Sequence, residues 1–81
     1  MSKIYVGNIQ WKTTEEDLKE LFNPYGTVTS AQVIKDRDTG RSRGFGFVKM
    51  ETEDQTKEAI NGLNGKELNG RTLVINEARR S

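Results

Sequence analysis

Three aromatic residues lie in two short stretches of the sequence where side chains alternate in type. Phe45 and Phe47 lie two residues apart in the segment RGFGFVKM, and Tyr5 lies in the segment KIYVG. Residues two apart in a β-strand share one face of the sheet, so both phenylalanines would share a face with Arg43 and Lys49. A protein core does not accept unpaired cations, because removing their hydration is costly. The spacing therefore predicts that the rings lie on a solvent-exposed sheet face.

Exposed rings interleaved with cations suit the binding of single-stranded nucleic acid. A base can stack on each ring, and such stacking contributes about 1–3 kcal/mol per base whatever the base is. Cations beside the rings can pair with phosphates, and Lys3 supplies one near Tyr5. We therefore expect single-stranded RNA as the partner, with single-stranded DNA as an alternative that the residue types do not exclude.

Other residues extend this candidate face. Gln32 and Asn76 are expected to point outward, where they could hydrogen-bond base edges or simply be solvated. Ile34 is expected on the same face, and Arg79 follows the last strand, where it could cover bound RNA or fray. The candidate RNA-binding residues are Lys3, Tyr5, Gln32, Ile34, Arg43, Phe45, Phe47, Lys49, Asn76 and Arg79.

The composition excludes several other classes of site. The chain has neither histidine nor cysteine, which rules out imidazole catalysis, disulfides and thiolate metal sites. We expect no metal and no cofactor. No apolar run approaches membrane-spanning length, so we expect a monomeric cytoplasmic domain without a membrane partner. The net charge of +1 is uninformative, but acidic residues dominate segments 12–20 and 51–58 whereas cations dominate segment 35–43.

The elements that would position the rings follow from periodicity and capping residues. Thr14 and Thr52 are typical helix N-caps, and Gly65 is typical of the position after a helix. Asn69-Gly70 is typical of a two-residue hairpin turn. The pattern predicts strands at 3–7, 28–35 and 43–50, a short strand near 67–68, a last strand near 72–77, a polar loop at 36–42, and helices beginning after Thr14 and after Thr52.

This order of elements predicts an α+β domain with the ferredoxin-like β-α-β-β-α-β topology. Right-handed crossovers give a four-stranded antiparallel sheet in the order 4-1-3-2, with two helices on one face. Strands 1 and 3 are then the central pair, so Tyr5, Phe45 and Phe47 cluster on the uncovered face. At 81 residues the chain suffices for one domain, which we assign to 1–81, with a core of about 2–78 and a tail at 79–81.

The two aromatic stretches also resemble a known family. RGFGFVKM at 43–50 is similar to the longer ribonucleoprotein signature of the RNA recognition motif, and IYVGNI at 4–9 is similar to its shorter companion signature. The resemblance covers nearly the whole chain and is greatest to short single-domain members. Further matching residues are Leu18, Leu21, Phe22, Gly26, Ala59, Ile60, Leu63, Asn64, Gly65, Gly70, Arg71 and Leu73.

The resemblance implies specific roles for the aromatic face. By it, Tyr5 and Phe47 each stack one base, Phe45 lies between two sugars, and Arg43 pairs with a phosphate. Met50 departs from the signature, whose last position is usually aromatic, but strand parity turns this residue toward the helices. The implied function is RNA binding without catalysis, in post-transcriptional regulation or RNA chaperoning.

Two other functions are alternatives to RNA binding. A protein-interaction domain could use the aromatic face or the acidic helical side, although family members of that kind usually lose the stacking aromatics. An enzyme such as a small phosphohydrolase would need a phosphate-cradling loop and a positioned arginine after the first strand. The segment from Asn8 to Thr13 supplies neither of these clearly.

Overall fold

The computed structural model describes residues 3–10, 12–40, 42–68 and 70–78, excluding the side chains of Ser42 and Arg43. The elements in chain order are β1 (Lys3–Gly7), α1 (Glu15–Phe22), the 3-10 helix η1 (Asn23–Tyr25), β2 (Val28–Lys35), β3 (Ser42–Met50), α2 (Glu53–Leu63), β4 (Glu67–Leu68), β5 (Arg71–Thr72) and β6 (Val74–Ala78).

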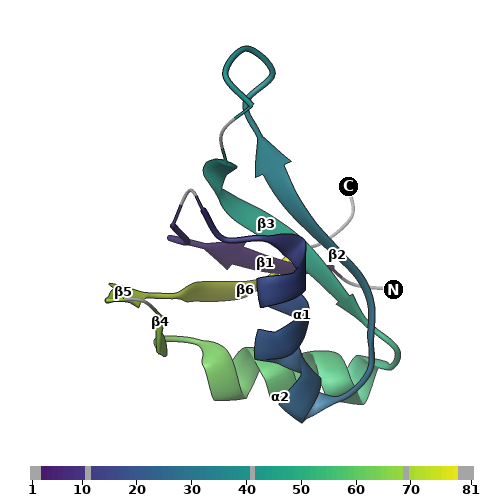
Figure 1. Ribbon diagram of the computed structural model, residues 1–81. Coiled ribbons are helices and arrows are strands. Elements are labelled where there is room, and N and C mark those ends of the chain that lie inside the picture. Colours follow the sequence, from purple (N-terminus) through teal and green to yellow (C-terminus); the bar gives the residue numbers. More distant parts are fainter. Residues whose placement is uncertain (1–2, 11, 41, 69, 79–81) are drawn as a thin grey trace.

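Four of the strands form an antiparallel sheet in the order β2-β3-β1-β6. The two helices pack against this sheet, and its central strands are β1 and β3 (Figure 1). The predicted β-α-β-β-α-β topology and strand order are therefore confirmed. The two aromatic segments of the sequence come to lie side by side as a result.

The predicted last strand is wrong in its boundary. Arg71 and Thr72 belong to a separate hairpin with β4, and the sheet strand β6 begins only at Val74. Between them, the N–H of Leu73 donates to the carbonyl of Lys66 at 2.8 Å. The predicted hairpin turn includes Asn69, which lies outside the described residues, and Gly70, which has a φ of 80°.

Both helices begin at the predicted caps. The hydroxyl of Thr14 accepts from the N–H of Asp17 at 3.1 Å, and the Asp17 carboxylate accepts from the N–H of Thr14 at 3.0 Å. This reciprocal pair is a capping box. The hydroxyl of Thr52 accepts from the N–H of Gln55 at 3.1 Å. Side chains thus satisfy backbone donors that each helix start leaves without an intrahelical acceptor.

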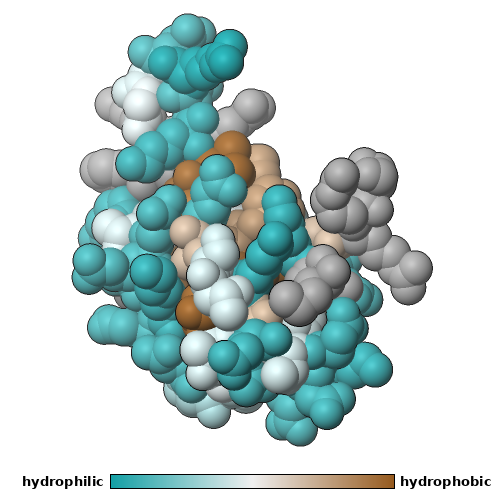
Figure 2. Space-filling model, turned by 90° about the vertical axis from the view of Figure 1, so that its right-hand side faces the viewer, coloured by the Kyte–Doolittle hydropathy of each residue, from teal (hydrophilic) through white to brown (hydrophobic). Residues whose placement is uncertain are grey.

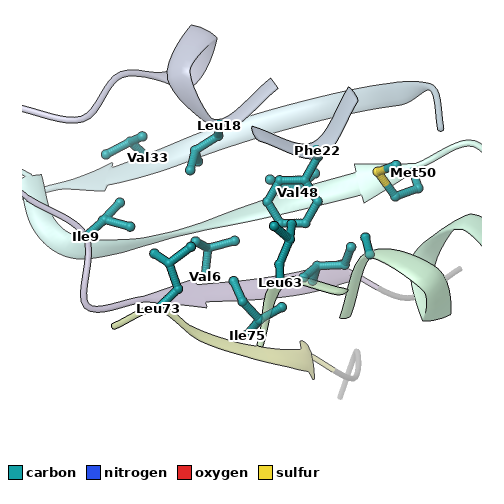
Figure 3. Packing of buried hydrophobic residues seen from close by; sticks show 12 residues of the cluster. Val6, Ile9, Leu18, Phe22, Val33, Val48, Met50, Leu63, Leu73 and Ile75 are labelled. Carbon is teal, nitrogen blue, oxygen red and sulfur yellow. The ribbon is translucent and has the colours of Figure 1, made fainter. Parts of the chain in front are cut away.

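The core forms between the helices and one face of the sheet (Figure 3). Strand residues that alternate with the aromatic rings are buried, as are the apolar stripes of both helices. The fully or nearly fully buried residues are Ile4, Val6, Leu18, Phe22, Val48, Met50, Ala59, Leu63, Leu73 and Ile75. Met50 is 2% exposed, so its departure from the family signature falls in the core, as parity predicted.

The loop between β2 and β3 projects from the body of the molecule (Figure 1). Its surface is hydrophilic in the view of Figure 2. The Asp36 carboxylate accepts from the N–H groups of Asp38 and Thr39, and the N–H of Gly40 donates to the Asp36 carbonyl at 2.9 Å. These bonds give the turn a defined shape at the end of the β2–β3 ribbon.

Candidate nucleic-acid interface

The three aromatic rings of β1 and β3 form one contiguous cluster. Tyr5 is directly opposite Phe47, and Gly7 is directly opposite Phe45. The ring centroids are 5.8 Å apart for Tyr5 and Phe45 and 6.0 Å apart for each of the other two pairs. All three residues are only half-buried, while their neighbours Ile4 and Val48 are buried beneath the helices. The rings therefore occupy the sheet face that the helices leave uncovered.

Two amide side chains complete the row that contains Tyr5 and Phe47. Gln32 on β2 is directly opposite Phe47, and Asn76 on β6 is directly opposite Tyr5. Both amides are exposed. Directly opposite residues in an antiparallel pair have Cβ atoms about 4.5–5.5 Å apart, so each ring has one amide group within reach of anything stacked on it.

Gly7 lets the Tyr5 ring lean along its own strand. A Cβ atom at Gly7 would lie 2.7 Å from the Tyr5 ring carbon Cε2 and 2.7 Å from its hydroxyl. The ring thus covers the glycine and extends toward Phe45, with which it is stacked at an interplanar angle of 29°. Sequence reasoning missed this arrangement, although a glycine two residues after an exposed aromatic was a signal that could have indicated it.

Two lysines, Lys3 and Lys49, lie beside the aromatic cluster at the end where β1 begins. Lys3 was expected beside Tyr5, but its ammonium lies over the Phe47 ring, with Nζ 5.6 Å from the ring centroid. Lys49 lies on the same face of β3, two residues after Phe47, and the register that pairs Ile4 with Val48 brings it next to Lys3. Both lysines are half-buried.

Apolar residues border the cluster at the opposite end from these lysines. Val74 on β6 is directly opposite Gly7 and is 43% exposed, which is unusual for a large hydrophobic residue in this structure. Ile34 on β2 is half-buried. The candidate face thus changes from cationic to aromatic to aliphatic along the strands.

Two predicted contacts lie outside the described part of the structure. The Arg43 side chain and the whole of Arg79 are not described, so their predicted contacts with RNA stay predictions. The backbone at Arg43 belongs to β3, which puts this residue on the same strand as both phenylalanines.

The two glycines of β3 allow close backbone packing and an unusual backbone conformation. A Cβ at Gly46 would lie 3.3 Å from the Leu18 side chain of α1, so the backbone of β3 approaches this helix closely. The same Cβ would lie 2.4 Å from the carbonyl oxygen of Gln32 on the adjacent strand, so the closest approach is to β2. Gly44 has a φ of 87°, which favours glycine for conformational reasons. Both glycines therefore shape β3 rather than forming a phosphate-binding loop.

Asn8 joins the end of β1 to the β4–β5 hairpin. Its Nδ2 donates to the carbonyl of Thr72 at 2.7 Å, and its Oδ1 accepts from Nη1 of Arg71 at 3.2 Å. Its φ of 60° is unusual for a residue other than glycine, though less so for asparagine. The Asn8 side chain therefore ties the end of β1 to the β4–β5 hairpin through hydrogen bonds.

The described residues hold no group of three or more acidic, histidine or cysteine side chains arranged to bind a metal ion. Among those same residues, neither helix has the length and hydrophobicity needed to cross a membrane.

A family profile described as the RNA recognition motif matches residues 4–74 of the chain. Among curated proteins, the chain is 52% identical over 77 residues to the mitochondrial glycine-rich RNA-binding protein 4 of Arabidopsis thaliana. It is 46% identical over 77 residues to a glycine-rich RNA-binding protein of Daucus carota. These alignments cover 95% of the chain but only 57% and 49% of the two relatives.

Solved structures resemble the chain over all or nearly all of its length. A crystal structure of RNA-binding protein PG1 superposes with a TM-score of 0.94 at 52% identity, covering 100% of this chain and 98% of that one. The Rna15 domain in its structure with bound RNA (GU) has a TM-score of 0.86 at 29% identity, covering 96% of this chain and 83% of that one.

Proposed function

The chain belongs to the RNA recognition motif family, which is non-enzymatic, and from this premise we propose that it binds single-stranded RNA on the uncovered sheet face. The observation that carries the proposal is the half-buried cluster of Tyr5, Phe45 and Phe47 on the two central strands. Rings placed in this way keep part of their surface open to solvent on the side away from the helices. They therefore leave flat faces free for stacking with bases.

In the proposed complex, Tyr5 and Phe47 each stack one base, and Phe45 contacts the sugars between them. Gln32 and Asn76 lie in the same row as these two stacking rings. Their amides carry both donors and acceptors and can pair with base edges. This spacing supports recognition of two adjacent nucleotides at the centre of the site.

Cations around the rings would neutralise phosphates. Lys49 borders the aromatic row, and Arg43 precedes it on the same strand. Arg79 follows β6 in the sequence and would contact the RNA near that edge strand. Ile34 lies on β2, the other edge strand, and would supply an apolar contact there. Attraction of this kind depends little on sequence and weakens as salt concentration rises.

The neighbouring Rna15 domain was solved with bound RNA (GU), which supports RNA as the ligand of a face built on this fold. Binding of single-stranded DNA is the alternative ligand for the same stacking surface. We propose that the chain acts as a monomer in post-transcriptional regulation or RNA chaperoning. A cytoplasmic location stays a prediction, since relatives carry "mitochondrial" and "chloroplastic" in their names.

Phe47→Ala tests this proposal. The substitution removes one stacking surface, so affinity for a mixed-sequence single-stranded RNA should fall by about 1–3 kcal/mol in a fluorescence anisotropy titration. Tyr25→Ala is the matched control, because Tyr25 is a half-buried aromatic that packs against Gly62 of α2, away from the sheet face. Equal affinity of Phe47→Ala and wild type, with both proteins folded by circular dichroism, would contradict the stacking proposal.

A further inference from the structure

Lys3 occupies an unusual place on the candidate face. It lies on β1 two residues before Tyr5, which is opposite Phe47, so Lys3 and Phe47 are diagonal neighbours across the two central strands. Long side chains reach such diagonal neighbours. The Lys3 ammonium uses this reach to lie over the Phe47 ring, with Nζ 5.6 Å from its centroid.

This position coincides with the place that a base stacked on Phe47 would fill. A stacked base lies parallel to the ring at about 3.5 Å, the van der Waals separation of carbon atoms. An ammonium 5.6 Å from the ring centroid must then lie against the edge of that base or move aside. The long flexible side chain of lysine allows the small displacement that places Nζ beside the base edge.

The chemistry of the ammonium group restricts which bases it favours. Lysine has three donors and no acceptor, so it can pair only with acceptor atoms. At the position where guanine and uracil carry the carbonyl oxygens O6 and O4, adenine and cytosine carry the amino groups N6 and N4, which are donors. We propose that Lys3 faces this position of the base on Phe47, and so makes the Phe47 subsite select guanine or uracil, through O6 or O4, over adenine or cytosine.

This inference rests on the proposed function. It gives Lys3 a role in selecting the base, which a simple phosphate contact would not give it. A phosphate contact strengthens the binding of every sequence equally. Lys49 provides the comparison, because it lies next to Lys3 on the same face and is also half-buried. Lys49 serves as the phosphate-binding cation of the pair in the proposed complex, whereas the Lys3 ammonium lies over the Phe47 ring.

Uridine and cytidine octamers give the sharpest test. Uracil and cytosine have rings of the same size, and at C4 one has a carbonyl and the other an amino group. The quantity measured is the ratio of the two affinities for wild type, Lys3→Met and Lys49→Met. We expect Lys3→Met to lower the uridine-to-cytidine affinity ratio by about three- to tenfold. Lys49→Met should weaken both octamers and leave the ratio unchanged.

Each outcome of this experiment is decisive. An unchanged ratio in Lys3→Met, with both octamers still bound, would overturn the selective role of Lys3 and leave the proposed function intact. The same would follow if Lys49→Met lowered the ratio as much as Lys3→Met does. Failure of folded wild-type protein to bind the octamers and also the mixed-sequence RNA would overturn both this inference and the proposed function.

Discussion

Tyr5 and Phe47 are directly opposite each other on the two central strands, and their ring centroids are 6.0 Å apart. The next pair in the same register is Ile4 and Val48, which are 0% and 1% exposed. Moving one residue along the strands therefore leads from a pair on the surface to a pair in the core. This alternation lets a single sheet supply both the core of a small domain and a binding surface.

Adjacent substitutions on β1 should therefore have opposite effects. Ile4→Ala removes a fully buried side chain and should lower the free energy of unfolding by about 2–5 kcal/mol. Tyr5→Ala should lower RNA affinity by about 1–3 kcal/mol, since it removes a stacking surface. Urea denaturation measures the first effect and an RNA titration the second.

The comparison between these two variants is the informative measurement. Tyr5→Ala should change stability much less than Ile4→Ala does, because the ring is only half-buried. A loss of stability in Tyr5→Ala as large as that in Ile4→Ala would mean that the ring is part of the core. The uncovered face would then not be available for stacking.

Strand parity was sufficient to predict the two faces of β1 and β3 from sequence. By their spacing, Phe45 and Phe47 share one face of β3 with Arg43 and Lys49, and this pattern predicted that Val48 and Met50 lie on the other face. Both Val48 and Met50 are buried. Thr14 and Thr52 marked the helix starts, because an N-cap requires a side-chain acceptor at one defined position. Local rules therefore determine most of this fold.

Other features depend on contacts that no local rule describes. The position of Lys3 over Phe47 follows from a rotamer that reaches across strands, and parity alone placed Lys3 beside Tyr5. The break in the last strand at Leu73 depends on its backbone bonds to Gly65 and Lys66 after α2. The exposed Val74 became a boundary of the aromatic face only once its register with Gly7 was known.

Gly7→Ala should weaken RNA binding without removing any ring. The new Cβ would lie 2.7 Å from atoms of the Tyr5 ring, so the ring must leave its position over residue 7 and its stacking against Phe45. We expect affinity to fall by about threefold to tenfold, since the stacking partner of one base is no longer held in place. An NMR titration would report both the affinity and the shifted Tyr5 ring resonances.

The double variant Gly7→Ala/Tyr5→Ala provides the control for this effect. If Gly7 acts only through the ring, Gly7→Ala should have no further effect on affinity once Tyr5 has been replaced. An additive loss in the double variant would show that residue 7 acts on RNA in another way.

Gly46→Ala should instead lower stability. Its Cβ would lie 2.4 Å from the Gln32 carbonyl oxygen, which is backbone of β2 and cannot rotate away. The strands must separate locally, at a cost of about 1–3 kcal/mol in the free energy of unfolding. Ser30→Ala, at an exposed position of β2, should change stability by less than about 0.5 kcal/mol under the same denaturation conditions. Equal stability of the two variants would contradict the close strand approach at Gly46.

The salt dependence of binding separates phosphate contacts from base contacts on the same face. For single-stranded nucleic acid, each neutralised phosphate contributes about −0.7 to the slope of log affinity against log salt concentration. If Lys49 contacts a phosphate, Lys49→Gln should make this slope shallower by about 0.7, whereas Asn76→Ala should weaken binding without changing it. Anisotropy titrations at several potassium chloride concentrations measure both quantities. An unchanged slope in Lys49→Gln would remove this lysine from the phosphate-binding set, and a shallower slope in Asn76→Ala would mean that its loss also displaces a phosphate contact.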